Sequence, residues 1–255
     1  MERVLNRRSF LLGSGLTAAG LIGSGLSDTA KAVAAPVSHA LESAIPTGEN
    51  SNSCRPKDPL ATLLEGNRRF AAAWQKNNEA TTLPARADAM AGLWQRSCFL
   101  PANVLTNSQA PWAGLLSCAD SRVSPEWVFD AAPSDLFVVR SAGNTAFNDA
   151  IASLEYTVGV LKTPLIMVMG HSACGAVKAA RDNTPLTPLL EQLVTPIRAS
   201  LTAGDDLEAA VKGNARYAAK QLTKRSQVLA DAVNNGTLTI VTSYFDIQSG
   251  KVTLL

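Results

Sequence analysis

The sequence predicts an α/β domain built on a mostly parallel sheet, because short apolar stretches alternate with segments of helical periodicity. Residues 165–169 are apolar throughout, which is typical of a parallel strand buried on both faces. Apolar side chains recur at helical spacing over residues 151–161. Near the C-terminus, Ser249-Gly250 has the composition of a hairpin turn, so residues 251–255 are expected to form an antiparallel strand.

The individual elements follow from local signals. Asp58-Pro59 predicts the start of the first long helix, because aspartate accepts hydrogen bonds at a cap and proline suits the first turn. Apolar runs predict four strands in addition to the C-terminal one, and helical spacing predicts the helices between them. The expected strands cover 112–118, 136–139, 165–169 and 238–241, and the expected later helices cover about 186–201 and 207–233.

Charge and composition exclude some classes of partner. The chain has 255 residues, of which 46% are hydrophobic and 5% aromatic, and its formal net charge is +2. The first 32 residues carry that small excess of positive charge. The rest of the chain is electrically neutral and has few aromatic residues. It therefore provides no positive electrostatic field that would attract nucleic acid or an anionic membrane, and neither is expected as a partner.

The N-terminus has the features of an export signal. Its segment Asn6-Arg7-Arg8-Ser9-Phe10-Leu11-Leu12 resembles the signal of the twin-arginine export route. Residues 10–26 are uncharged but rich in glycine, which makes them a poor permanent membrane span. Ala30-Lys31-Ala32 has the small-x-small pattern of a cleavage site, although an uncleaved anchor is the alternative.

These signals divide the chain into three parts. We expect a signal peptide over residues 1–32, a flexible lead-in over 33–57, and one domain over 58–255. The expected destination is the periplasm, or the thylakoid lumen if the source is photosynthetic. Because this route carries folded cargo, a metal bound before export would protect thiolates from oxidation.

Cysteine and histidine are few, and three of them lie near strand ends. The chain has cysteines at 54, 98, 118 and 174 and histidines at 39 and 171. Cys118 closes one expected strand, and His171 follows another, three residues before Cys174. Ligands collect at the carboxyl ends of strands in such sheets. Two thiolates and an imidazole suit zinc and leave a fourth position for water, but spacing alone leaves open that these are buried structural residues.

The remaining cysteines and the other histidine carry less information. His39 falls in the expected lead-in and has no partner motif. Cys54 and Cys98 are compatible with an internal disulfide, with free thiols or with a link between subunits, and the sequence does not choose among these.

Several motifs, in order along the chain, resemble those of the β-carbonic anhydrases. Cys118-Ala119-Asp120-Ser121-Arg122 and His171-Ser172-Ala173-Cys174 resemble the two zinc motifs of that family. The resemblance extends from about residue 58 to the end. It includes the segments 64–70, 136–144, 154–156 and 245–252. Two positions depart from the family pattern, with Ala119 where serine is usual and Ser141 where asparagine is frequent.

The resemblance implies a zinc enzyme that reversibly hydrates CO₂ to bicarbonate and a proton. One Zn²⁺ per chain would be held by Cys118, His171 and Cys174, and a zinc-bound hydroxide would attack CO₂. Asp120 would accept a hydrogen bond from that group, and Arg122 would keep Asp120 ionised and oriented.

The resemblance also implies a substrate pocket and a partner subunit. Five positions match the family's substrate-binding positions, with Tyr156 approaching from a partner. They are Gln109, Phe137, Ala142, Tyr156 and Gly175. Leu115 stands where a self-closing branch has tryptophan, so the permanently open, plant-like branch is implied. The N-terminal helices, to which Phe70 and Trp74 belong, would embrace the partner of a homodimer, and dimers can pair into tetramers.

Three other functions fit parts of the pattern. A hydrolase of carbonyl sulfide or carbon disulfide would use the same fold and zinc, and an inactive zinc-bearing protein could bind bicarbonate. A thiol redox protein is a different class, but it would need a Cys-x-x-Cys pair, which the sequence lacks.

Overall fold

The structure is a computed structural model that describes residues 50–182 and 185–255. The predicted signal peptide, most of the predicted lead-in and His39 lie outside the described residues. Among the helices of the described part, none combines the length and the apolar character needed to cross a membrane.

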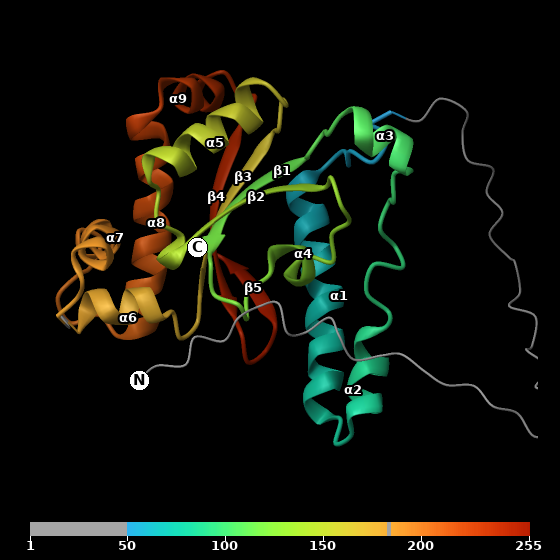
Figure 1. Cartoon of the computed structure of the whole chain (residues 1–255), viewed down its shortest axis with the longest axis horizontal. Helices are drawn as coiled ribbons and strands as arrows, with labels where there is room; N and C mark the ends of the chain where they lie inside the picture. Colours follow the sequence, from blue (N-terminus) through green and yellow to red (C-terminus); the bar gives the residue numbers. More distant parts are fainter. Residues whose placement is uncertain (1–49, 183–184) are drawn as a thin grey trace, which may run out of the picture. The chain divides into compact units, whose positions relative to one another are not determined.

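The centre of the fold is a five-stranded sheet in the order β2-β1-β3-β4-β5 (Figure 1). Neighbouring strands are parallel from β2 to β4, and β5 pairs antiparallel with β4. The predicted fold class, including the antiparallel C-terminal strand, is therefore confirmed. The strands are β1 (Ala113–Cys118), β2 (Leu136–Ser141), β3 (Leu165–His171), β4 (Thr239–Asp246) and β5 (Lys251–Leu254).

Helices cover both faces of the sheet (Figure 1). The face toward α1 and α4 carries one cluster of buried apolar side chains, and the opposite face, toward α5, α8 and α9, carries a second. The helices on the first side are α1 (Pro59–Glu79), α2 (Leu83–Met90), α3 (Ala102–Asn107) and α4 (Pro125–Val128). Those on the second are α5 (Asn148–Gly159), α6 (Gly175–Arg181), α7 (Pro188–Arg198), α8 (Leu207–Arg225) and α9 (Gln227–Asn234).

The expected elements are present, with three differences. Strand β4 extends to Asp246, five residues beyond its expected end at 241. The helix expected over 207–233 is divided at Ser226, whose side chain accepts a hydrogen bond from the Leu229 N–H and so caps α9. The short helices α2 and α3 do not follow from periodicity, because neither of them buries a residue and so neither has an apolar face.

Helix α1 is fixed at its start and along its length. Asp58 Oδ1 accepts the N–H of Ala61 at 2.9 Å, as expected for the cap. Gly66 lets the helix approach the chain at Phe129, because a Cβ at this position would lie 1.9 Å from the Phe129 carbonyl oxygen. Asn67 donates to the carbonyls of Val128 and Gly250, which ties α1 to the β4–β5 hairpin.

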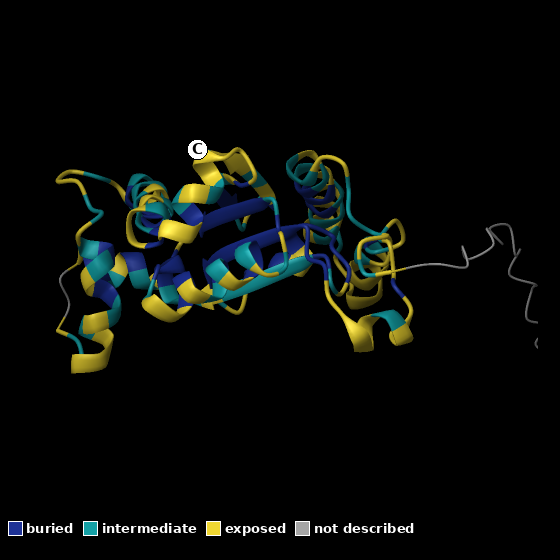
Figure 2. Cartoon of the chain, turned by 90° about the horizontal axis from the view of Figure 1, so that it is seen from above, coloured by how far each residue is buried: buried dark blue, intermediate teal, exposed yellow. Residues whose placement is uncertain are grey.

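The two central strands form the most buried part of the molecule. Every residue of β1 and of β3 is buried, and Figure 2 shows these strands in dark blue between partly exposed helices. Burial on both faces explains why these strands lack polar alternation in the sequence.

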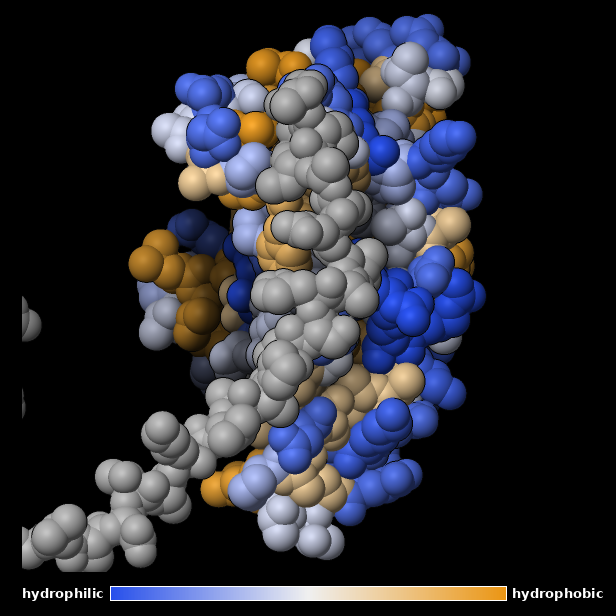
Figure 3. All heavy atoms as spheres, turned by 90° about the vertical axis from the view of Figure 1, so that its right-hand side faces the viewer, coloured by the Kyte–Doolittle hydropathy of each residue, from blue (hydrophilic) through white to orange (hydrophobic). Residues whose placement is uncertain are grey.

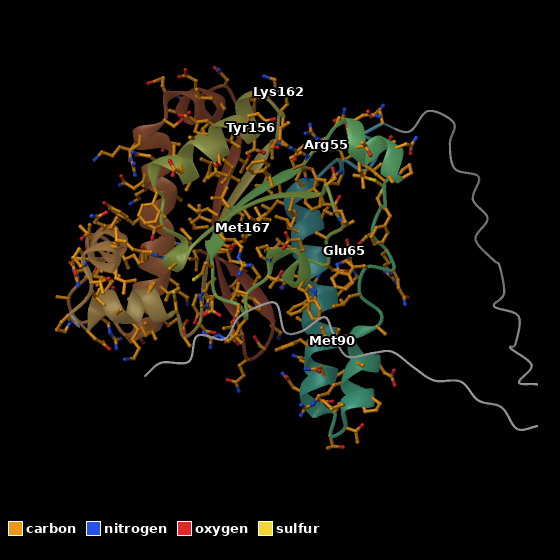
Figure 4. All side chains as sticks on the ribbon, viewed as in Figure 1. Arg55, Glu65, Met90, Tyr156, Lys162 and Met167 are labelled. Atoms are coloured by element: carbon orange, nitrogen blue, oxygen red, sulfur yellow. A yellow bond between two sulfur atoms is a disulfide. The ribbon has the colours of Figure 1, made fainter. Side chains whose placement is uncertain are left out.

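The amino-terminal end of the sheet is held by two contacts from the segment before α1. Cys54 and Cys98 form a disulfide across 44 residues, which decides a question that the sequence leaves open. The next residue, Arg55, donates from its guanidinium group to the carbonyls of Pro111, Leu161 and Lys162 at 2.8–3.1 Å. Figure 4 shows Arg55 and Lys162 toward the same end of the sheet. The segment before α1 is thus joined to the loops that precede β1 and β3.

Replacing Cys54 by serine should lower the free energy of unfolding by about 2–4 kcal/mol, because a disulfide restricts the unfolded chain. Chemical denaturation under non-reducing conditions measures this change. The Cys98→Ser variant and the double variant should lose the same amount, since all three changes break one bond. Additive losses, or a double variant as stable as the unchanged protein, would contradict a structural disulfide.

Candidate metal centre

The carboxyl ends of β1 and β3 bring three metal-binding side chains together. Cys118 is the last residue of β1, His171 is the last of β3, and Cys174 is the N-cap residue of α6. Their ligand atoms lie within 4.8 Å of one another, and all three residues are buried. They are the same three residues that the sequence selects.

The geometry of these atoms fits a tetrahedral zinc ion. The two sulfur atoms are 4.0 Å apart, and two sulfurs bound to one tetrahedral zinc at ~2.3 Å would be about 3.8 Å apart. His171 is fully buried, and its Nε2 has no hydrogen-bond partner. Its Nδ1 lies 2.9 Å from the Ser172 carbonyl oxygen, which suits an N–H donor there and leaves the Nε2 lone pair free. An unpartnered buried nitrogen beside two sulfurs therefore matches a metal ligand set.

The two thiols influence each other strongly. The pKa of Cys118 is lowered to about 4, chiefly because Cys174 donates a hydrogen bond to its sulfur, with burial acting in the opposite direction. The pKa of Cys174 is raised, first because it is the donor in that pair and then because it is buried. The pair thus readily gives one thiolate, and a cation placed between the sulfurs would favour the second.

Asp120 and Arg122 form a closed pair beside the cluster. Arg122 donates from Nε to Asp120 Oδ1 at 2.9 Å and from Nη2 to Oδ2 at 2.6 Å. The pKa of Asp120 is well below its usual value, chiefly because of these side-chain hydrogen bonds. Asp120 Oδ2 also lies 3.9 Å from His171 Nε2, so the ionised carboxylate is close to the ligand atoms.

Arg140 supports this loop and does not stand out in the sequence as a site residue. It donates from Nε to the Cys118 carbonyl at 3.1 Å, and from Nη2 to those of Asp120 and Val123 at 2.7 and 2.9 Å. The only hint in the sequence is that this positively charged residue directly follows the four apolar residues 136–139 of β2. Its role depends on the pairing of β2 with β1, which the sequence does not show.

An apolar cavity of about 340 Å³ lies against Arg122. Aromatic residues from α1, α4 and β4 contribute most of its apolar wall. They are Phe70, Trp74, Trp127 and Phe245. Ser121, Arg122 and Ser124 supply its polar side, so the cavity places an apolar surface beside the Arg122 side chain.

The structure separates the five predicted substrate-binding residues into two groups. Ala142 follows β2 and Gly175 follows Cys174, so both lie at the metal rim. Phe137 lies four residues before the end of β2, about 13 Å along the strand from that rim. Tyr156 packs beside Phe137 with ring centroids 6.2 Å apart, and Gln109 precedes β1. In Figure 4, Tyr156 lies above Met167 of β3, toward Lys162. One chain therefore does not bring this second group to its own metal ligands.

Comparison with known proteins agrees with this arrangement. The family profile described as "Carbonic anhydrase" matches residues 113–252, more than half of the chain. A carbonic anhydrase of Mycolicibacterium smegmatis is 37% identical over 162 residues, which cover 59% of this chain and 77% of that protein. Carbonic anhydrase 2 of Mycobacterium tuberculosis is 32% identical over 201 residues, which cover 75% of this chain and 89% of the relative.

Solved structures show the same fold. A tetrameric β-carbonic anhydrase of Sordaria macrospora aligns with a TM-score of 0.54 at 22% identity, covering 77% of this chain and 96% of that one. The Coccomyxa β-carbonic anhydrase aligns with a TM-score of 0.51 at 27% identity, covering 78% and 87%. With this fold, these relatives and a Cys-His-Cys cluster at the strand ends, the chain belongs to the β-carbonic anhydrase family of enzymes.

Proposed function

We propose that this enzyme reversibly hydrates CO₂ to bicarbonate and a proton, with one Zn²⁺ held by Cys118, His171 and Cys174. The observation that carries the proposal is the buried, unpartnered Nε2 of His171 facing two sulfur atoms and the Asp120 carboxylate. A buried imidazole nitrogen with no partner is costly, and a metal ion would satisfy it.

Zinc at this site would supply a water with its pKa lowered toward ~7, the nucleophile that CO₂ hydration needs. The protein's own groups orient the reaction. Arg122 holds Asp120 in its ionised form, so the carboxylate can only accept hydrogen bonds. It would accept one from the water that zinc supplies and so fix the orientation of that water toward CO₂. Arg122 Nη2 also lies 3.3 Å from the Ala173 carbonyl, which joins the loop of Asp120 to the loop of Cys174.

The open form of the site is part of the proposal. Leu115 is fully buried in β1, within the apolar cluster on the α1 face, and it offers no polar group for a bicarbonate. Both oxygens of Asp120 are engaged by Arg122. We therefore expect Asp120 to remain beside the metal as an acceptor and not to become a ligand.

We also propose that a second copy of the chain completes the pocket. Gln109, Phe137 and Tyr156 lie near the opposite end of the sheet from the metal rim of their own chain, and the Tyr156 side chain is exposed. Helix α2 buries none of its residues within the chain, and Leu83 at its start is 80% exposed. Figure 3 shows the side that carries α1 and α2, where apolar patches lie among hydrophilic ones. Such surfaces support an embrace by the N-terminal helices.

The purified enzyme should contain about one zinc ion per chain, and His171→Ala should lose most of it, because three ligands are the minimum for such a site. Elemental analysis after dialysis against a weak chelator measures the metal content. Tyr217→Phe on α8 is the control and should keep full zinc. A His171→Ala variant with a full complement of zinc would overturn the ligand assignment.

Replacing Asp120 by alanine should leave zinc in place and slow CO₂ hydration by at least ~10²-fold, the scale of a positioned proton-handling group. Stopped-flow hydration assays measure the rate. Asp182→Ala is the matched control, since Asp182 is paired with Lys178 at 2.7 Å outside the metal cluster. Assays of H₂S release from carbonyl sulfide and carbon disulfide, run on the same samples, test the alternative substrates.

The pH dependence tests the same role of Asp120. Because the pKa of Asp120 lies well below its usual value, its charge does not change across the neutral range. Hydration should therefore follow a single titration near ~7, with activity rising as the pH rises. Near-normal activity of Asp120→Ala would remove Asp120 from the mechanism. An abrupt loss of wild-type activity as the pH falls, with Asp120 coordinating the metal, would contradict the open form of the site.

We further propose that residues 1–32 direct export by the twin-arginine route to the periplasm. The Cys54–Cys98 disulfide supports this, because such bonds persist in oxidising compartments. Arg7→Lys with Arg8→Lys should retain the chain in the cytoplasmic fraction of a bacterial host, whereas the control Arg3→Lys should not. Export of the double variant at the normal level would contradict the route.

A further inference from the structure

A loop between β2 and α5 contacts the metal centre through its backbone. The N–H of Gly143 donates to Cys118 Sγ at 3.3 Å. Gly143 has a φ of +70°, and a Cβ there would lie 2.6 Å from Cδ1 of Ile197 and 3.2 Å from Cβ of Ala176. The loop can reach the sulfur because this position has no side chain and adopts a left-handed conformation.

The opposite side of the same glycine is held from helix α8. Asn214 lies 71 residues further along the chain and is 2% exposed. Its Nδ2 donates to the Gly143 carbonyl at 2.8 Å, and its Oδ1 lies 3.3 Å from Ser200 Oγ. The amide is therefore buried, and its hydrogen bond to the Gly143 carbonyl holds the glycine in one orientation.

We propose that Asn214 is a positioning residue for the metal centre, which holds Gly143 so that the glycine N–H donates to the Cys118 sulfur. This inference rests on the proposed zinc site. A hydrogen bond to a thiolate lowers the energy of the sulfur lone pairs and holds the sulfur in the position that the metal needs, and such supporting contacts favour metal binding by orienting the ligand. Without the Asn214 amide, the buried Gly143 carbonyl loses a partner and the loop relaxes away from the sulfur.

The test uses the full zinc protein and its Asn214→Leu variant. Leucine has the same branched arrangement of side-chain heavy atoms as asparagine, with bulkier methyl groups, but it cannot donate a hydrogen bond. Asn214 also borders a cavity of about 320 Å³, and an apolar side chain discourages water from entering there to replace the amide. The expected result is a rise of about 10- to 100-fold in the zinc dissociation constant, measured by chelator competition.

Cobalt substitution gives a readout that reports on the sulfur directly. Loss of the N–H contact should raise the energy of the sulfur lone pairs, so the sulfur-to-cobalt charge-transfer band of Asn214→Leu should move to longer wavelength. Tyr217→Phe is the matched control, because Tyr217 lies one turn along α8 and lines the same cavity. Its zinc affinity and its cobalt band should equal those of the unchanged protein.

A smaller variant keeps the proposal testable if leucine prevents folding. Asn214→Ala leaves room for a bridging water, so it should shift the affinity and the band in the same direction but by less. Unchanged affinity and an unmoved band in both variants would overturn the proposal. Weaker binding with an unmoved band would also overturn it, because that outcome describes a general packing role.

The failure of this inference is distinct from a failure of the proposed function. If the unchanged protein bound no zinc, the metal assignment itself would fall. If the unchanged protein bound zinc and Asn214→Leu bound it equally well, only the role of Asn214 would fall.

Discussion

The parallel pairing of β1 with β3 is the constraint on which the site depends. In that register Ser117 lies opposite Met169, so the two strands reach the same edge of the sheet together. For that reason Cys118 and His171, the last residues of β1 and β3, lie close together at the carboxyl ends of the strands. Since side chains alternate between faces, a slip of one residue would turn one ligand to the other side of the sheet. Complete burial of both strands on both faces stabilises the register against such a slip.

Charged groups around this rim have separate tasks. Arg140 holds the backbone between Cys118 and Val123, whereas Arg122 holds the carboxylate of Asp120. The Arg140 contacts position the end of β1 and the turn that follows it. The Arg122 contacts keep the Asp120 carboxylate ionised and set its orientation. Each guanidinium binds through two of its nitrogens, which is the geometry that arginine suits better than lysine. These contacts fix the backbone and the carboxylate that surround the Cys-His-Cys cluster.

The two ends of the sheet have different tasks. The predicted metal ligands lie at the carboxyl ends of the strands. At the amino-terminal end of the sheet, the Cys54–Cys98 disulfide and the Arg55 contacts with the loops before β1 and β3 stabilise the fold. Residues that the family resemblance assigns to substrate, such as Phe137 and Tyr156, lie toward this second edge. The proposed second copy of the chain would bring the two ends together, since one chain holds them at opposite ends of its own sheet.

The roles of the Cys-His-Cys set and of the Asp120–Arg122 pair are implied by the family resemblance, whereas the sequence by itself determines the order of the strands and long helices and places Cys118, His171 and Cys174 near strand ends. These features are local, because periodicity, caps and strand-end motifs operate over a few residues. Only the tertiary structure decides that Cys54 pairs with Cys98, that Arg140 binds the carbonyls of residues 118, 120 and 123, and that Asn214 binds the Gly143 carbonyl. Each of these contacts joins residues 17 to 71 positions apart. They depend on strand order and on the packing of α8 against the sheet, which no local pattern encodes.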